Sequence, residues 1–353
     1  MCVRFKGVVV VLGEHPSGGG ETPAMQRVAN RTIACHALES LAAAGVDELA
    51  VVAPRSSLPE LRSRLEQDLT GDIEPVYLPL GGRADLVGAL RGSLDFVGAD
   101  TSIVHLGDGL VGQSFDQVID LLGAESADMT LLLHRDGNGR DGLGPSVERL
   151  LGVRELGDAR SRLALTGVCM FGPGMLRRVT DEAGDLGPDA GLVEIADLLA
   201  GAGCTFEAGV VPSWRRYRGD PVDLLELNRL VLDGQRPEIE TLHRGADNRI
   251  EGRVIIDHSA EVSSSVILGP CIIGAHARVA DSYIGPYTSI GPGAEIEGAE
   301  IVSSIVSDGV RIRHISGRIE GSTIGCRSSI FRDFSLPRAM RLHVGEDVEV
   351  ALQ

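Results

Sequence analysis

The glycine-rich segment near the N-terminus is the first place where residue types and spacing could do chemistry. Ser17–Gly20 follows the apolar run Val8–Leu12, and consecutive glycines allow backbone N–H groups to converge on a phosphate. Two acids, Glu14 and Glu21, flank this segment and would repel a polyphosphate unless a metal intervened. The segment is therefore a candidate anion-binding loop, and a plain flexible turn is the alternative.

Histidines and cysteines are the other residues whose side chains could take part in a reaction or bind a metal. A histidine at the edge of the repetitive C-terminal part could act as general base in acyl transfer, although a lone histidine there is more often a corner or surface residue. The six cysteines are scattered without a C-x-x-C pair, which predicts small buried thiols in a reducing cytoplasm rather than a disulfide framework or zinc site. The candidate histidines are His258, His276, His314 and His343.

The composition limits the classes of partner. The chain has 353 residues, with 50 acidic and 33 basic side chains, for a net charge of −17. This balance argues against nucleic acid and against an anionic membrane surface, because both need a basic footprint. No apolar stretch reaches the ~18–20 residues of a membrane span. The N-terminus has a weak signal-peptide character, but its short apolar run before a glycine-rich turn favours a first buried strand and a cytoplasmic protein.

Residues 1–235 alternate strand-like and helix-like segments. The run Val8–Leu12 suits a buried strand, and an amphipathic helix is expected over Thr32–Ala44, ending at Gly45. This rhythm predicts a Rossmann-like α/β domain with a mostly parallel sheet, helices on both faces, and ligands at the carboxyl ends of the strands. The other expected strands are Glu48–Val52, Glu74–Leu78, Ser102–Leu106 and Met129–His134, and the other expected helices are Leu58–Leu69, Leu86–Phe96 and Phe115–Leu122.

The pattern changes after a polar linker at residues 236–252. From 253 to 353 the helical periodicity disappears, and aliphatic residues recur every five or six positions, often before a glycine. A repeat near six predicts a parallel β-helix with three short strands in each coil. A β-sandwich is the alternative, and the lack of two-residue hairpin turns counts against it. The recurring residues are Val262, Leu268, Ile273, Val279, Ile284, Ile290, Ile296, Val302, Ile319, Ile324 and Ile330.

Three segments resemble one family, the long-form glucose-1-phosphate thymidylyltransferases of actinomycete deoxysugar pathways, which are sugar nucleotidyltransferases. The resemblance covers nearly the whole chain and implies a nucleotidyltransferase domain followed by a left-handed parallel β-helix. Such proteins join a nucleoside triphosphate to a sugar 1-phosphate and release pyrophosphate, with Mg²⁺ as cofactor. A homo-oligomer is also implied. The resembling segments are Val28–Val46, Ser161–Val168 through Asp223–Asp233, and Asp281–Gly291 with Gly317–Ser322 and Pro337–Leu342.

The phosphate loop and the metal pair of that family are incomplete here. The family loop carries an Arg and a Pro-Lys, whereas no Arg or Lys lies between Lys6 and Arg27. One of the two metal-binding aspartates is matched by Asp108, which follows a glycine after an expected strand. The second is replaced by Tyr217, and a phenol is a poor magnesium ligand. Asp108 is therefore the candidate metal ligand, with a turn or helix-capping role as its alternative.

An aspartate displaced along the chain is one way in which the metal pair could be rebuilt. Asp220 and Asp223 lie close to Tyr217 in the sequence and are the candidates for this replacement.

The parts that would read the base and the sugar are also altered. Asp85 stands where the family has a glycine against the base, and Arg83 is either an anion-binding residue or an exposed loop residue. Gly152 and Glu194 resemble sugar-binding positions, but the family's Glu-Lys-Pro is absent and Cys169 replaces a tyrosine. The nucleotide-binding candidates are Gly13, Ser17, Gly18, Gly19, Gly20, Arg83 and Asp85, and the sugar-binding candidates are Gly152 and Glu194.

Three functional hypotheses follow. An active nucleotidyltransferase with a rearranged phosphate loop would make a nucleotide sugar or nucleotide cyclitol, and it predicts that Asp108 and a second carboxylate converge on one metal. A non-catalytic member would be a regulator, a ligand sensor or a partner of an active paralogue, and it predicts a cavity without converging cations. Acyl transfer by the β-helix ranks last. The altered motifs favour the second hypothesis, with catalysis lost or strongly reduced.

Overall fold

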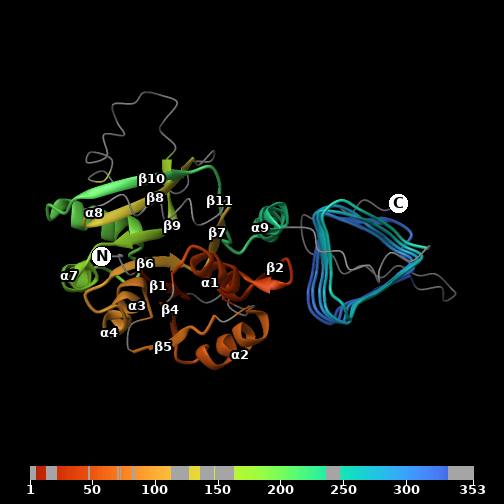
Figure 1. The fold of residues 1–353 in the computed structure, drawn as a ribbon, viewed down its shortest axis with the longest axis horizontal. Coiled ribbons are helices and arrows are strands. Elements are labelled where there is room, and N and C mark those ends of the chain that lie inside the picture. The colour runs from red at the N-terminus through yellow and green to blue at the C-terminus, as the bar shows by residue number, and fades with distance from the viewer. Residues whose placement is uncertain are drawn as a thin grey trace, which may run out of the picture.

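The structure, a computed structural model, describes residues 5–12, 22–46, 48–69, 71, 73–81, 84–112, 127–135, 147, 163–235 and 247–332. Two architectures follow each other along the chain (Figure 1): an α/β part built on a seven-stranded sheet, and a triangular column of short parallel strands. None of the described helices is long and apolar enough to cross a membrane.

The sheet of the α/β part is mostly parallel, as predicted, with one antiparallel strand. Its order is β10-β8-β9-β6-β1-β4-β5. The central strand β1 pairs in parallel with β4 and β6, whereas β9 runs antiparallel to both β6 and β8. The strands are β1 (Phe5–Val10), β4 (Glu48–Pro54), β5 (Val76–Leu80), β6 (Thr101–Leu106), β8 (Met129–Arg135), β9 (Leu163–Phe171) and β10 (Phe206–Val211).

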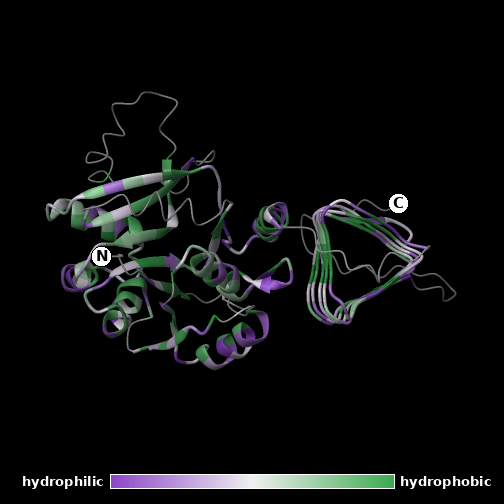
Figure 2. Ribbon diagram, in the orientation of Figure 1, coloured by the Kyte–Doolittle hydropathy of each residue, from purple (hydrophilic) through white to green (hydrophobic). Residues whose placement is uncertain are grey.

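Helices cover both faces of this sheet, which explains the continuous apolar run of its first strand. Val8 and Val10 belong to one buried core, and Val9 and Val11 belong to the other, because successive side chains point to opposite faces. Figure 2 shows green, hydrophobic stretches along these strands and helices, with purple, hydrophilic stretches beside them in α2 and α7. Helices α1 (Ile33–Ala43) and α2 (Leu58–Asp68) pack on one face, and α3 (Leu86–Gly92), α7 (Met175–Glu182) and α8 (Leu192–Gly201) pack on the other.

Local capping sets several helix boundaries. The side chain of Thr32 accepts a hydrogen bond from the Cys35 amide, so Thr32 caps α1 rather than belonging to it as predicted. The helix expected over Leu86–Phe96 is two helices, because α3 ends at Gly92 and a separate turn of helix, α4 (Leu94–Val97), follows. The helix expected over Phe115–Leu122 lies outside the described residues.

The C-terminal column is a left-handed parallel β-helix, as the resemblance implied. Three five-stranded parallel sheets form its faces. Paired strands of the first coils are offset by 17 positions, as in the bond from the Ser282 amide to the Ser265 hydroxyl. The first face comprises β12 (Arg249–Glu251), β15 (Val266–Leu268), β18 (Tyr283–Ile284), β21 (Glu300–Val302) and β24 (Arg318–Glu320).

The other two faces complete each coil. The second face comprises β13 (Val254–Ile256), β16 (Cys271–Ile273), β19 (Thr288–Ile290), β22 (Ile305–Val306) and β25 (Thr323–Ile324). The third comprises β14 (Glu261–Ser263), β17 (Arg278–Ala280), β20 (Glu295–Glu297), β23 (Arg311–Arg313) and β26 (Ser329–Phe331). The strand β12 starts inside the range predicted as linker, because its backbone pairs with β15.

Stacked aliphatic side chains fill the column, with two corrections to the predicted set. Ile267 and Ile301 are fully buried in its core, whereas their predicted neighbours Leu268 and Val302 are half-buried and outside it. The shift by one position has a simple cause, since adjacent residues of a strand point to opposite sides. Leu268 precedes Gly269, as the repeat pattern requires, but this glycine marks the corner of the coil and not the inward position.

Helix α9 (Pro221–Gly234) lies between the two parts (Figure 1) and joins them through one fully buried side chain, Asn228. Its Oδ1 accepts hydrogen bonds from the Ala29 amide at 2.8 Å and from the Ser289 hydroxyl at 2.6 Å. Its Nδ2 donates to the Tyr287 carbonyl at 3.0 Å. One amide therefore ties the α/β part to the third coil of the column.

Candidate functional site

A cavity of about 580 Å³ opens where strands β1 and β6 end, at the carboxyl edge of the sheet. This position agrees with the expectation for ligands of a mostly parallel sheet. The volume also lies within the ~300–1,000 Å³ of small-molecule sites. The charged residues that line it are Asp85, Asp108, Asp189, Arg216 and Arg218.

Asp108 lies in this cavity and is held by an arginine. It connects β6 to β7 (Gly109–Val111), which pairs antiparallel with β11 (Trp214–Arg216). Its Oδ2 accepts a hydrogen bond from Nε of Arg216 at 2.7 Å, and its carbonyl accepts one from the Tyr217 amide at 2.8 Å. Its Oδ1 is buried and has no hydrogen-bond partner among the described residues. The carboxylate is thus already paired with a cation of the chain itself.

The second metal position offers no carboxylate. Tyr217 is 5% exposed, and burial raises the pKa of its phenol, with Asp223 and Asp220 adding to the effect. The phenol therefore stays neutral near pH 7.

The neighbouring acids serve the start of α9 instead. Asp220 accepts a hydrogen bond from the Val222 amide, and Asp223 accepts one from the Arg218 amide. Within the described residues, no group of three or more His, Cys, Asp or Glu side chains could hold a metal. The side chains around Asp108 therefore do not fit the magnesium site of the resembling family.

Asp85 and Glu194 both act at helix starts. Asp85 lines the cavity and caps α3, because its Oδ1 accepts a hydrogen bond from the Gly88 amide at 2.8 Å. Glu194 accepts one from the Gly191 amide at 2.8 Å and is exposed. Gly191 lines the cavity, whereas Glu194 is not among the described lining residues. Their roles as base-reading and sugar-binding residues remain predictions.

The other predicted site residues fall on parts of the chain that the structure does not describe. They are Gly13, Ser17, Gly18, Gly19, Gly20, Arg83 and Gly152. The described cavity instead brings in Arg216 and Arg218, which were not among the predicted site residues. The sequence pattern of β11 could have identified Arg216. Trp214 is buried, and alternate residues of a strand lie on the same side, so Arg216 shares the side of Trp214.

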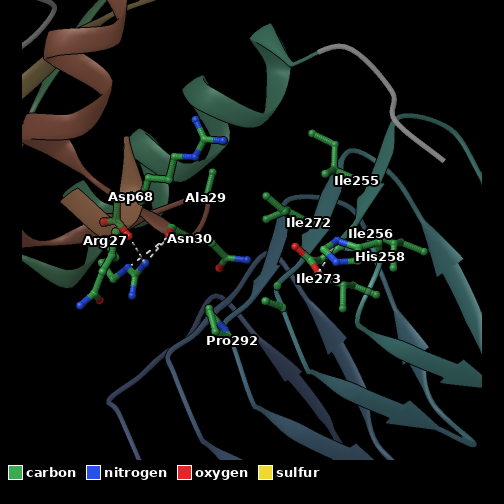
Figure 3. Close-up of a pocket in the computed structure, with 15 residues that line it drawn as sticks. Arg27, Ala29, Asn30, Asp68, Ile255, Ile256, His258, Ile272, Ile273 and Pro292 are labelled. Carbon is green, nitrogen blue, oxygen red and sulfur yellow. Dashed lines mark hydrogen bonds and ion pairs between the residues drawn. The ribbon is translucent and has the colours of Figure 1, made fainter. Parts of the chain in front are cut away.

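A second cavity, of about 640 Å³, lies between the α/β part and the column (Figure 3). Arg27, Asn30 and Asp68 line one side, and the outward-facing isoleucines Ile255 and Ile272 line the other.

An ion pair and a hydrogen bond, Arg27 with Asp308 and Asn30 with Ile290, span this boundary. Arg27 pairs with Asp68 at 2.7 Å and with Asp308 of the column at 2.5 Å, and Asn30 donates to the Ile290 carbonyl. Burial raises the pKa of Asp68, although Arg27 acts in the opposite direction. These contacts fix how the two parts meet.

The histidines and cysteines of the described residues give no reactive cluster. The side chain of His258 is 77% exposed and lies 3.4 Å from Asp257, while His276 and His314 occupy left-handed corner positions with φ of 56° and 54°. His343 lies outside the described residues. The cysteines Cys35, Cys169, Cys204 and Cys271 are buried, as predicted, whereas Cys326 is exposed, contrary to the prediction. It lies in the turn between β25 and β26, directly after Ile324-Gly325.

The fold and the cavity define a class: a nucleotidyltransferase-like α/β domain that carries a left-handed β-helix. The chain is 29% identical over 334 residues to a glucose-1-phosphate thymidylyltransferase of Streptomyces griseus, covering 90% of each chain. It is 31% identical over 342 residues to a low-salt glycan biosynthesis nucleotidyltransferase of Haloferax volcanii, covering 92% of each chain.

A solved structure is similar in fold: a putative glucose-1-phosphate thymidylyltransferase from Bacillus anthracis in complex with a sucrose. Its TM-score is 0.52 at 16% identity, over 66% of this chain and 98% of that chain. A search of protein-family models gave no match. The chain belongs to the sugar nucleotidyltransferase family that includes the glucose-1-phosphate thymidylyltransferases.

Proposed function

We propose that this chain is a sugar-1-phosphate nucleotidyltransferase-family protein in which catalysis is lost or strongly reduced, and that it acts as a cytoplasmic regulator, ligand sensor or partner of an active paralogue. A homo-oligomer is part of the proposal, as the family resemblance implied.

The observation that supports this proposal is the pairing of Asp108 with Arg216 beside a buried Tyr217. Transfer of a nucleotidyl group depends on positioning and on neutralising the charge that develops on the phosphates. In the resembling family this neutralisation uses Mg²⁺ held by two aspartates. Here one aspartate is engaged by a guanidinium at 2.7 Å, and the position of the other is a neutral phenol.

The expected loss of rate is large. Removal of one electrostatic device costs about 10²–10³ in rate, or roughly 3–4 kcal/mol of transition-state stabilisation. The missing Arg and Lys of the phosphate loop and the altered metal pair are two such devices. Their effects are not additive when residues act as a unit, so we expect a loss of at least the single-device size.

The test is pyrophosphate release with Mg²⁺ across a matrix of nucleoside triphosphates, including dTTP, and several sugar 1-phosphates. An active glucose-1-phosphate thymidylyltransferase serves as positive control, and circular dichroism verifies that the protein is folded. The Asp108→Asn variant separates the chain's own turnover from that of a contaminant. Turnover within about a hundredfold of the control would refute the proposal, and the absence of turnover by folded protein is the expected result.

An active enzyme with a rearranged loop is the second candidate, with nucleoside triphosphate, sugar 1-phosphate and Mg²⁺ as its reactants and cofactor. The observation in its favour is the cavity of about 580 Å³ at the carboxyl edge of the sheet, lined by Arg216 and Arg218. The non-catalytic hypothesis predicted a cavity without converging cations, whereas two arginines line this one. However, the convergence of a second carboxylate on Asp108, which the active enzyme requires, has no counterpart at Asp220 or Asp223.

A further inference from the structure

The strand β11 sorts its two arginines into different surroundings. Trp214 is buried, and the residues after it alternate sides. Arg215 reaches Glu226 on α9, where its Nε lies 2.9 Å from the carboxylate and both side chains are about half exposed. Arg216 points to the opposite side and lines the cavity beside Asp108. The two arginines thus form a natural pair of test and control residues.

The guanidinium of Arg216 is held at one end and available at the other. Its Nε donates to Asp108, and within the described residues its two terminal nitrogens have no hydrogen-bond partner. The side chain is 38% exposed, against 19% for Asp108. An arginine fixed through Nε still presents donors whose geometry suits the oxygens of a phosphate. The carboxylate therefore orients the guanidinium and leaves its terminal nitrogens for a ligand.

We propose that Arg216 takes the place of the divalent cation in this cavity, so that the chain binds a nucleoside diphosphate sugar without a metal. This inference rests on the proposed function, because a working transferase needs the metal at the same place. The chemical class follows from charge. Three acids, Asp85, Asp108 and Asp189, line the cavity beside two arginines, Arg216 and Arg218. Without a divalent metal this balance disfavours a triphosphate, whereas a diphosphate ester carries less negative charge.

The exposed carboxylate of Asp189 also suits the sugar end of such a ligand. Asp189 is exposed at the cavity, and a carboxylate accepts hydrogen bonds from sugar hydroxyls. The diphosphate would then lie against Arg216. A chain with this site would report the concentration of the nucleotide sugar that its active relatives produce.

The direct test is isothermal titration calorimetry of the full chain with dTDP-glucose, UDP-glucose, ADP-glucose and GDP-mannose, in EDTA and in excess Mg²⁺. We expect at least one probe to bind with a Kd that changes less than about twofold between the two buffers. The Arg216→Gln variant should bind that probe about tenfold or more weakly. The Arg215→Gln variant, which changes the neighbouring arginine outside the cavity, should bind it as the wild type does.

The Asp108→Asn variant distinguishes a metal site from an Arg216 site, because the two sites predict opposite changes in ligand affinity. If Asp108 held a metal that carries the ligand, its loss would abolish binding. If Arg216 carries the ligand, removal of the neighbouring negative charge should make the Kd several-fold tighter, because the amide oxygen of asparagine can still accept the bond from Nε of Arg216. Far-UV circular dichroism of each variant confirms folding, and the EDTA comparison on the wild type needs no variant at all.

Several outcomes would overturn the inference: binding that requires Mg²⁺, an unchanged Kd in Arg216→Gln, or no binding of any of the four probes by folded protein. A different observation would refute the proposed function, namely pyrophosphate release by the wild-type protein. Turnover with Mg²⁺ and binding without it are separate measurements, so each idea can fail alone.

Discussion

Replacing Asn228 by alanine should weaken the union of the α/β part and the β-helix. The change removes three hydrogen bonds, to the Ala29 amide, the Ser289 hydroxyl and the Tyr287 carbonyl. Each contributes about 0.5–1.5 kcal/mol net, and a buried group left without a partner costs more. Because Asn228 is fully buried, water cannot easily replace the lost partners. We expect the free energy of unfolding to fall by about 3–4 kcal/mol.

The assay is urea unfolding followed by circular dichroism, with the free energy taken from linear extrapolation. Glu226→Ala on the same helix is the matched control, since that carboxylate is about half exposed and pairs with Arg215 on the surface. It should change stability by less than about 1 kcal/mol. A loss below about 1 kcal/mol in Asn228→Ala would refute the view that this side chain holds the two parts together.

Three further predictions concern the α/β part. Burial lowers the pKa of His105 from 6.5 to about 4, so the folded protein resists protonation of a ring that the unfolded chain protonates readily. The free energy of unfolding should therefore be highest above pH 6.5 and should fall as the pH falls toward 4. Between pH 7.5 and 5 this loss should be about 2 kcal/mol in urea titrations, and equal pH slopes for wild type and His105→Gln would contradict it. Gly109→Ala would place a Cβ 2.5 Å from the Trp214 ring and 2.6 Å from the Arg215 carbonyl oxygen, so its free energy of unfolding should fall by about 1–3 kcal/mol in the same titrations. Asp85→Ala should lower thermal stability by the equivalent of about 1 kcal/mol through loss of the α3 cap, and an unchanged Tm would count against that capping role.

The sequence was most informative where one physical requirement dominates. The run Val8–Leu12 must be apolar on both sides because two cores flank it, so its place as a buried central strand was predictable. The β-helix was predictable for a similar reason, since each coil has to supply inward aliphatic residues. The position within a strand was not, as Leu268 and its inward neighbour Ile267 show. Both are aliphatic, and only the corner geometry decides which of them points inward.

The cavity was less predictable, because its residues meet across long stretches of chain. Asp108 was recognisable from its place after a strand, but its partner Arg216 lies 108 positions later and belongs to a different strand. Asp85 was chosen as a replacement for a glycine, yet its side chain caps the helix that follows it. Aspartate serves in metal sites and in helix caps alike, so residue type and spacing alone could not separate these roles.

The spacing of the β-helix coils restricts how this part of the gene can change in length. Cys271 pairs with Thr288, 17 positions on, but Ser289 pairs with Ile305 after 16 positions and Ile305 with Thr323 after 18. On this face a missing residue in one coil is thus followed by an additional one in the next, and the side chains of the later strands keep their columns. On the first face Tyr283 pairs with Glu300 after 17 positions and Glu300 with Arg318 after 18, so a single extra residue is also accommodated at a corner. Small changes in length are therefore expected at corners, whereas duplication or loss of one complete coil, about 17 codons, would preserve every inward position.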